Sequence, residues 1–199
     1  IIFHAAAMKH VQMCEFNPFE ALKTNAIGTE NVIRASLECN VSKLITISTD
    51  KAVDPSTTMG ATKLLAEKLT IDGNNYRGSS KCKFSCVRFG NVIASRGSII
   101  PIFREQIKLG GPVTITEKSM TRFFISIDSA VDLVLKSSKM MKGGEIFVLK
   151  SMSSIRILDL AQVLIKQLSP NKEINIDYIG KRANEKLYEE LLTIEEMER

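Results

Sequence analysis

The stretch from Leu44 to Lys63, LITISTDKAVDPSTTMGATK, constrains the fold of this chain more than any other. It opens with an apolar run of the kind that forms a strand buried on both faces of a parallel sheet. A polar turn then leads into a predicted helix, on which Met59 and Lys63 share one face. Ligands of open α/β sheets bind at the carboxyl ends of strands, so a site is expected here. Its candidate residues are Thr49, Asp50, Lys51, Met59 and Lys63.

The rest of the chain alternates strand-like and helix-like segments, which is the pattern of an α/β protein. No G-x-G-x-x-G phosphate loop occurs, so the opening strand is expected to belong to the later part of a doubly wound sheet. Asn17 with Glu20, and Thr193 with Glu196, have the spacing of helix caps. Strands are predicted at 1–4, 44–47, 83–89, 113–115, 121–125, 145–149 and 174–179, and helices at 17–38, 59–75, 97–109, 127–139 and within 155–168.

The composition narrows the class of protein. With 199 residues, 44% hydrophobic and 25% charged, the chain can bury one substantial core. The formal charge of +5 is spread along the sequence without a basic block, so a nucleotide is a better expected partner than a nucleic acid. The four cysteines and two histidines lack metal-ligand spacing, and no metal site is expected. No apolar run has the length of a membrane helix, and a cytoplasmic protein with reduced thiols is expected.

Three strings carry a resemblance to a known family: HAAAMKHV, STDKAVDPSTTMGATK and RFGNVIASRGSIIPIF. They resemble the extended short-chain dehydrogenase/reductases, and among these the UDP-N-acetylglucosamine 4,6-dehydratases of polysaccharide biosynthesis. The resemblance runs from Phe3 to about Leu192. It implies an α/β fold: the C-terminal part of a Rossmann-like, doubly wound parallel sheet with a small α/β substrate-binding lobe.

The same resemblance implies a division of the chain. Residues 1–92 would form a partial nucleotide-binding domain, and residues 93–199 a substrate-binding lobe interleaved with the last elements of the core. The pyrophosphate-binding part of the fold would lie upstream, so this chain alone is expected to be inactive. A homo-oligomer is expected.

The resemblance also implies roles for individual residues. The cofactor would be NADP or NAD, and the substrate a UDP-sugar. Asp50 would be the acid for the departing C6 hydroxyl and Lys51 the base at C5, while Asn25 would support the active-site strand. The residues implied for the cofactor are His4, Ala5, Ala6 and Lys63, and those implied for the substrate are Lys9, Asn91, Arg122, Arg182 and Glu185.

Two places depart from the family pattern. Most of the superfamily has a tyrosine where this chain has Met59, and a thioether cannot take up a proton. The C4 proton would then leave through Thr49, through a water held by Lys63, or through the Asp50 and Lys51 pair, and Met59 would fill a gap beside the sugar. The second departure is RANEK, which stands where relatives have R-P-G-E-K, so Ala183 and Asn184 replace a proline-glycine turn.

Other functions remain open from the residues alone. A UDP-sugar 4-epimerase would use the same cofactor but needs no acid at C6, so the Asp50 and Lys51 pair favours the dehydratase. A nucleotide-binding regulator without catalytic activity would explain Met59. Nucleic-acid binding rests on charge alone and would show as steep salt dependence.

Overall fold

The computed structural model describes residues 1–93, 95, 97–150 and 152–198. Ala94 and Arg96 of the string RFGNVIASRGSIIPIF lie outside the described residues. The chain divides into two compact units, and their assignment to nucleotide and substrate binding stays a prediction. Unit 1 comprises Ile1–Phe89, Asp128–Lys150 and Glu190–Arg199, and unit 2 comprises Gly90–Ile127 and Ser151–Glu189.

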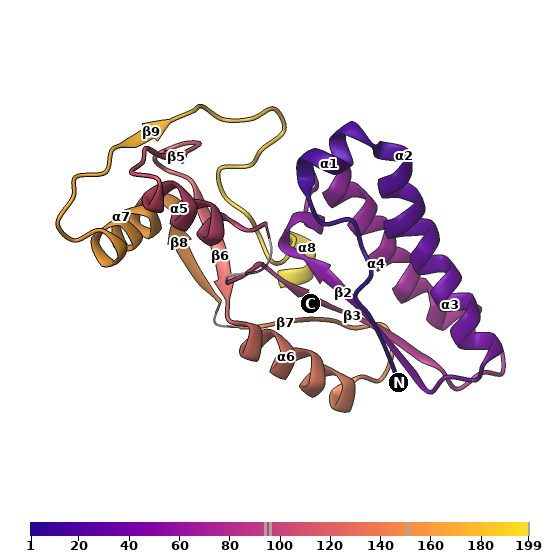
Figure 1. Ribbon diagram of the computed structural model, residues 1–199. Coiled ribbons are helices and arrows are strands. Elements are labelled where there is room, and N and C mark those ends of the chain that lie inside the picture. The colour runs from indigo at the N-terminus through magenta and orange to yellow at the C-terminus, as the bar shows by residue number, and fades with distance from the viewer. Residues whose placement is uncertain (94, 96, 151, 199) are drawn as a thin grey trace. The chain divides into compact units, whose positions relative to one another are not determined.

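Unit 1 is built on a parallel sheet with the strand order β1-β2-β3-β7 (Figure 1). Strands β2 and β3 pair over their full lengths, and Ser48 and Thr49 of β2 lie opposite Arg88 and Phe89 of β3. This parallel sheet confirms the predicted α/β fold. The strands are β1 (Ile2–His4), β2 (Lys43–Thr49), β3 (Lys83–Phe89) and β7 (Ile146–Val148).

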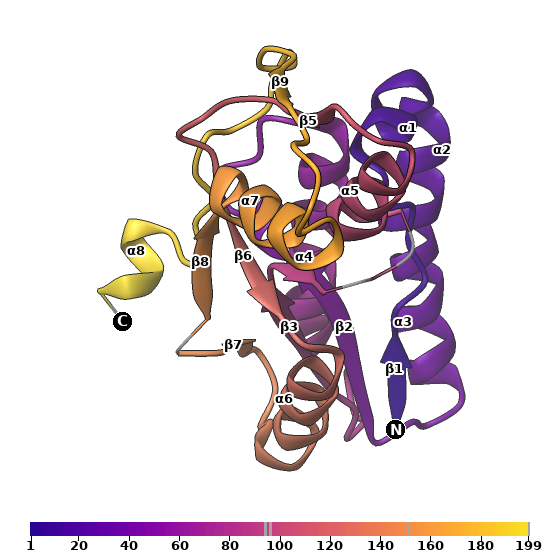
Figure 2. The ribbon, with the colours of Figure 1, turned by 60° about the vertical axis from the view of Figure 1, so that its left-hand side comes forward.

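Alternate residues of a strand face opposite sides of the sheet, and helices cover both faces of this sheet. Leu44 and Phe84 pack with Ile33 of α3 on one face, whereas Ile45 and Val87 belong to a cluster that includes residues of α6 on the other. Figures 1 and 2 show α3 and α4 on one side of the strands and α6 on the other. The helices of unit 1 are α1 (Val11–Phe16), α2 (Pro18–Ala21), α3 (Gly28–Glu38), α4 (Thr58–Tyr76), α6 (Ile127–Met140, which starts at the last residue of unit 2) and α8 (Ile194–Met197).

The helical region before β2 differs from the prediction. Helix α1 was not predicted, and the helix expected at 17–38 contains a π-helical stretch, η1 (Leu22–Ile27). The predicted side-chain cap by Asn17 is wrong, because its amide donates to the carbonyl of Met13 at 3.0 Å in the preceding helix instead. The capping box of Thr193 and Glu196 is present, as predicted.

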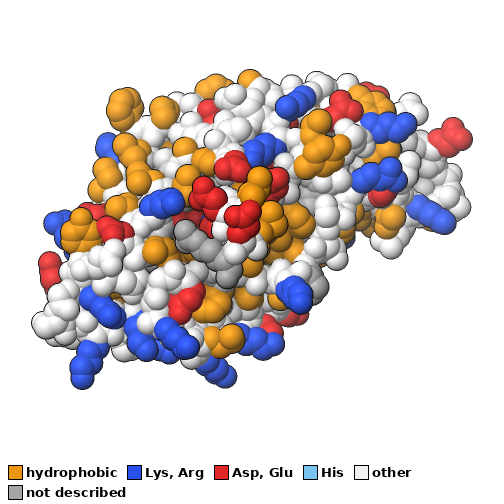
Figure 3. Space-filling view, turned by 180° about the vertical axis from the view of Figure 1, so that it is seen from behind, with side chains coloured by type: hydrophobic (Ala, Val, Ile, Leu, Met, Phe, Trp, Pro, Cys, Tyr) orange, Lys and Arg blue, Asp and Glu red, His pale blue; other side chains and the backbone are white. Residues whose placement is uncertain are grey.

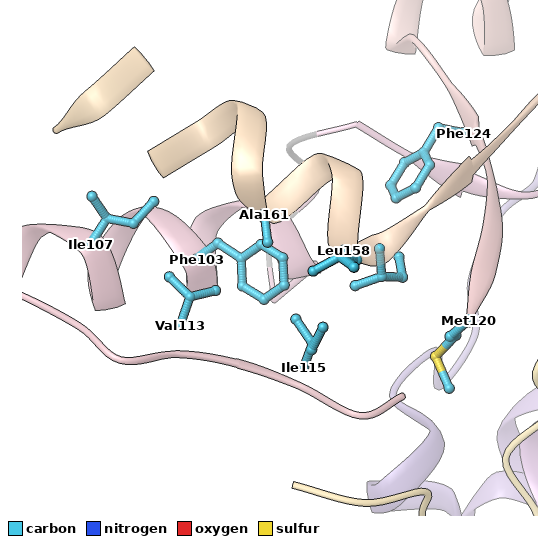
Figure 4. Close-up of a cluster of buried hydrophobic side chains, with 9 residues drawn as sticks. Phe103, Ile107, Val113, Ile115, Met120, Phe124, Leu158 and Ala161 are labelled. Carbon is cyan, nitrogen blue, oxygen red and sulfur yellow. The ribbon is translucent and has the colours of Figure 1, made fainter. Parts of the chain in front are cut away.

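Unit 2 has its own core. Strand β6 pairs with β4 in parallel and with β8 antiparallel, and β5 pairs with β9 in parallel. Figure 4 shows the ring of Phe103 among Val113, Ile115 and Ala161, which bring together β5 and the two helices of this unit. The elements are β4 (Asn91–Val92), α5 (Ile99–Lys108), β5 (Val113–Ile115), β6 (Thr121–Ile125), β8 (Ser153–Arg156), α7 (Ile157–Leu168) and β9 (Ile176–Tyr178).

Charged side chains of both signs occur on the face shown in Figure 3, where several acidic ones gather near the centre. On the face shown in Figure 3, lysine and arginine side chains occur singly or in small groups, with acidic and apolar side chains among them. Within the part of the chain that the structure describes, no helix is long and apolar enough to cross a membrane. The same residues include no cluster of three or more His, Cys, Asp or Glu side chains placed to hold a metal ion.

Candidate active site

The candidate site begins where β2 ends. Thr49 is the last residue of the strand, and a short 3-10 turn, η2 (Asp50–Ala52), follows it directly. The hydroxyl oxygen of Thr49 accepts a hydrogen bond from the backbone N–H of Lys51 at 3.4 Å and so caps this turn. Asp50 and Lys51 are therefore held at the carboxyl end of a central strand, where ligands of such sheets bind.

Asp50 is a fully buried carboxylate, with 0% of the residue exposed. Its Oδ1 accepts hydrogen bonds from the Lys51 ammonium and from the Thr49 hydroxyl, each at 2.9 Å. Its Oδ2 is buried as well and has no hydrogen-bond partner among the described residues. Because a buried polar atom without a partner is costly, this oxygen is a place where a ligand hydroxyl would be stabilised.

Helix α4 lies very close to this turn. A Cβ atom on Gly60 would collide with the backbone carbonyl oxygen of Lys51 and would press on Pro55. Only glycine permits this approach, because any other side chain would push the helix away from the turn. The first turn of α4 therefore fixes the position of the backbone at Lys51.

Lys63 lies one turn further along α4 and is only 7% exposed. Its ammonium donates a hydrogen bond to the carbonyl of Ile47, near the end of β2, at 2.5 Å. Burial lowers the pKa of Lys63, while Cys86 and Glu67 partly oppose this effect. The charged group of Lys63 is thus directed toward β2, and its convergence with Thr49, Asp50 and Lys51 on one crevice stays a prediction.

Three of the residues implied for the cofactor lie at the end of β1 and just after it: His4, Ala5 and Ala6. The hydroxyl of Thr29 donates to the carbonyl of Asn25 at 2.6 Å, so the Nε2–H of His4 must be the donor in its 2.9 Å bond to that hydroxyl. Burial, and then the charge of Lys63, lower the pKa of His4, which keeps the ring neutral at pH 7. The His4 ring is thus turned into the protein, whereas Ala5 and Ala6 are exposed, as is Lys9.

Asn25 ties two parts of the site together. Its Oδ1 accepts from the backbone N–H of Met8 at 2.7 Å, and its amide donates to the Met8 carbonyl and to the hydroxyl of Thr62. The resemblance implied support of the active-site strand. The structure shows instead that Asn25 holds the segment following β1 against α4.

Met59 points into an apolar cluster. It is 5% exposed and packs with Cys14 and Ala21, together with Met8 and Val11. These neighbours belong to α1 and α2 or to the segment just before α1. The described side chains packed against Met59 are all apolar, and its role in filling a gap beside the sugar stays a prediction.

Arg88 and Glu67 are buried charged residues that the sequence analysis did not single out. The guanidinium binds both carboxylate oxygens of Glu67, with N···O distances of 3.0 and 2.8 Å. The available signal was a charged residue inside the otherwise apolar strand KFSCVRF, together with a glutamate four residues after Lys63.

In unit 2, the residues implied for substrate binding are only partly brought together. Arg122 is largely buried, and its guanidinium lies 3.4 Å from Glu185 and 3.9 Å from Glu189. The same guanidinium donates to the carbonyls of Thr121 and Leu187. Asn91 lies in β4, and Arg182 is exposed.

The RANEK segment keeps a tight turn despite its changed residues. The N–H of Glu185 donates to the carbonyl of Arg182 at 3.2 Å, and Asn184 has a φ of 62°. A positive φ at the third position of a turn favours glycine, and asparagine is the residue that best replaces it. Asn184 therefore allows the turn that a proline-glycine pair forms in relatives.

Asn184→Gly is expected to leave the free energy of unfolding nearly unchanged, whereas Asn184→Ala should lower it by about 1 kcal/mol, because alanine has a Cβ but lacks the short polar side chain that lets asparagine adopt the left-handed region. Urea denaturation of the two variants measures the difference. Asn171→Ala, in another loop of the same unit, is the control. Equal stability of the Gly and Ala variants would contradict the turn assignment.

Comparisons with known proteins cover the whole chain. The family model described as polysaccharide biosynthesis protein matches residues 1–199. An uncharacterized membrane protein of Methanocaldococcus jannaschii is 59% identical over 99% of this chain, which spans 60% of that protein. The capsular polysaccharide biosynthesis protein CapD of Staphylococcus aureus is 50% identical over 98% of the chain, and the chain spans 33% of it. A UDP-glucose 4-epimerase of Rickettsia rickettsii is 48% identical, with 98% and 57% covered.

Solved structures give the same picture. Pen from Bacillus thuringiensis is 46% identical, with a TM-score of 0.91 over 96% of this chain and 60% of that one. The dTDP-glucose 4,6-dehydratase DesIV of Streptomyces venezuelae, solved with NAD bound, is 17% identical with a TM-score of 0.83, over 93% of this chain and 62% of that one. The second likeness concerns the fold alone.

Proposed function

The chain belongs to the polysaccharide biosynthesis protein family, and from this premise we propose that it carries the catalytic residues of a nucleotide-sugar 4,6-dehydratase acting on UDP-N-acetylglucosamine. The observation that carries the proposal is the ion pair between the buried Asp50 and the partly exposed Lys51 at the end of β2. A dehydratase needs an acid and a base side by side, and this pair supplies both.

A nicotinamide cofactor, NAD or NADP, would supply the hydride acceptor and donor for C4 oxidation and for the return of the hydride to C6. The residues present fit such a group. Ala5 and Ala6 are small and exposed, which leaves the backbone after β1 open to close approach. The Lys63 ammonium has three N–H donors, and the described bond to Ile47 uses one of them.

The contact between Lys51 and Asp50 generates the acid and the base together. The structure shows an N–H···O contact of 2.9 Å between an ammonium and a carboxylate. In the proposed mechanism, transfer of one proton along this contact would give a neutral amine and a carboxylic acid, which are the base and the acid that the dehydration needs. The Lys51 amine would then take the C5 proton while Asp50 gives its proton to the departing C6 hydroxyl, and the ion pair is restored.

The last step uses the same lysine. The Lys51 ammonium would return a proton to C5 when the hydride reaches C6, and the C4 hydroxyl proton released at the start would reprotonate Asp50. Overall, the sugar loses one water and the protein ends in its initial state. Thr49, whose hydroxyl donates to Asp50, would pass on the C4 proton.

Unit 2 would contribute to substrate binding. Arg122, Arg182 and Asn91 would bind the diphosphate, and Glu185 would accept hydrogen bonds from the ribose hydroxyls, as the resemblance implies. Lys9 of unit 1 is assigned to the substrate on the same ground. These assignments are proposals for the complete protein, since the chain spans only part of its relatives.

The deciding experiment incubates the complete protein with UDP-N-acetylglucosamine in heavy water. The proposal expects a product that has lost one water and carries deuterium at C5, visible in mass and proton NMR spectra. Loss of water without deuterium at C5 would remove the solvent-exchangeable lysine from the mechanism.

A UDP-sugar 4-epimerase is the second candidate, because a relative that is 48% identical carries the name UDP-glucose 4-epimerase. An epimerase would invert C4 without changing the mass of the sugar and without solvent deuterium at C5. The same incubation, repeated with UDP-glucose, therefore separates the two functions.

Met59 provides a separate prediction. In the complete protein, Met59→Leu should retain much of the activity, whereas Met59→Tyr should lower it or leave it nearly unchanged. A phenol would have to enter the apolar cluster around Cys14, which is packed for a flexible thioether. Steady-state rates of both variants against the parent measure this.

The opposite result would change the interpretation of the site. If tyrosine next to Lys63 restored a missing proton acceptor, the rate would rise at least about tenfold, which is about 1.4 kcal/mol of activation free energy. Such a rise would mean that the parent lacks a working acceptor and would favour the nucleotide-binding regulator.

A further inference from the structure

Arg88 is a buried arginine whose guanidinium N–H donors all have hydrogen-bond partners. It is 1% exposed, although it carries a permanent charge. Besides Glu67, its guanidinium binds both oxygens of Glu196, at 2.8 and 3.2 Å, and the carbonyl of Leu191 at 2.7 Å. Together with the two bonds to Glu67, all five N–H donors of the Arg88 guanidinium form hydrogen bonds.

Glu67 is also the neighbour of Lys63. The two residues are four positions apart on α4, and both are on its buried side. Residues with this spacing are neighbours on a helix surface, so a lysine and a glutamate can pair there, although the order with glutamate first is the more favourable one. Burial would strengthen such a pair, because no water would screen it.

We propose that Arg88 is a positioning residue for Lys63: by engaging both oxygens of Glu67, it prevents that carboxylate from pairing with the Lys63 ammonium. Lys63 is thereby kept on the carbonyl of Ile47, at the end of β2, instead of being drawn along α4 toward Glu67. Glu196 supports this arrangement from the other side of the guanidinium by balancing the charge of Arg88.

The charges around Lys63 agree with the proposal that Glu67 pairs with Arg88 and not with Lys63. His4 on β1, Cys86 and Arg88 on β3, and Glu67 on α4 are the titratable or charged side chains that act on Lys63 or on its helical neighbour. His4 is neutral at pH 7, and burial raises the pKa of Cys86 far above its ordinary value, so this thiol is uncharged too. Glu67 is therefore the one anion of this set, and Arg88 neutralises it.

The inference rests on the proposed function only in calling Lys63 a cofactor-site residue, because its electrostatics can be measured without turnover. The titration midpoint of Lys63 can be followed in the complete protein by NMR of isotope-labelled lysine side chains, with Lys63→Met identifying its signal. The parent gives the reference midpoint.

Three variants test the inference. Arg88→Met frees Glu67, and the Lys63 midpoint should rise by about one pH unit, as for a cation that gains a nearby carboxylate. Arg88→Met combined with Glu67→Leu removes that carboxylate, and the midpoint should return to the parent value or below it. Glu196→Gln keeps the contact between Arg88 and Glu67, so its midpoint should stay within a few tenths of a pH unit of the parent.

If Arg88→Met does not fold, Arg88→Lys carries the same test, because one ammonium cannot hold both carboxylates and a smaller rise is expected. An unchanged midpoint in the folded single variant, or a midpoint that stays high in the double variant, would overturn the inference and leave Arg88 a purely structural residue. An active enzyme should also show a larger increase in the KM for cofactor than decrease in kcat. A protein without dehydratase activity but with the predicted midpoints would contradict the proposed function alone.

Discussion

Lys51→Met is expected to lower kcat of the complete protein by about 10²- to 10⁴-fold, the usual effect of losing one positioned base. The substitution removes the amine that the mechanism assigns to the C5 proton and also the donor that faces Asp50 at 2.9 Å. Because Thr49 still donates to Asp50, the carboxylate keeps a partner and the turn should stay folded. The measurement compares steady-state rates and the rate of deuterium uptake at C5.

A matched control is available on the same unit. Lys136 forms an exposed pair with Asp132 on α6, so Lys136→Met removes the same charge away from the candidate site. Its rate should equal that of the parent. Near-parental deuterium exchange at C5 in Lys51→Met would exclude Lys51 as the base, even if turnover were slow.

Arg88→Met is expected to lower the free energy of unfolding by about 3–5 kcal/mol, which is typical of breaking a buried ion pair by removing one partner. The loss arises mainly at the buried carboxylate that Arg88 binds. Glu67 is almost fully buried and would lose both hydrogen bonds from Arg88. Leu191 would lose a donor to its carbonyl, so the segment before α8 should loosen as well. Urea denaturation followed by circular dichroism measures the loss.

Arg34→Met is the control for this prediction, because Arg34 and Glu30 form an exposed pair on α3. Its loss should be about 0.3–0.5 kcal/mol. Equal losses of unfolding free energy in the two variants would mean that the buried ion pairs of Arg88 contribute no more than an exposed ion pair.

The stability of unit 1 should also depend on acid pH through Glu196. Burial opposes ionisation of this carboxyl, but hydrogen bonds from Arg88 and from the backbone of Thr193 hold its pKa below the ordinary value. The stability from this group is therefore present above the ordinary glutamate pKa and is lost as the pH falls through the lowered value. Arg88→Met should make this acid-dependent loss smaller.

The sequence by itself determined the fold class and the position of the candidate site. The apolar side chains before Thr49 are removed from water when this run forms a buried strand, and the polar residues after it then lie at the end of that strand. The turn residues predicted that a helix, α4, begins shortly after this strand, and the spacing of Met59 and Lys63 predicted that both lie on one face of that helix. These are local properties, because backbone periodicity and the burial of neighbouring side chains set them.

Tertiary structure alone decided which side chains are partners. Nothing in the sequence indicated that Asn25 would bind Met8 or that Arg88 would join Glu67 to Glu196, since these contacts link positions far apart in the chain. Such long-range contacts form only where parallel strands and the helices between them bring distant segments to one place. The cap predicted at Asn17 failed for a local reason, because the carbonyl of Met13, four residues earlier in α1, offers its amide another acceptor. Periodicity reports which face of an element is buried, whereas the partner on that face depends on how the elements pack.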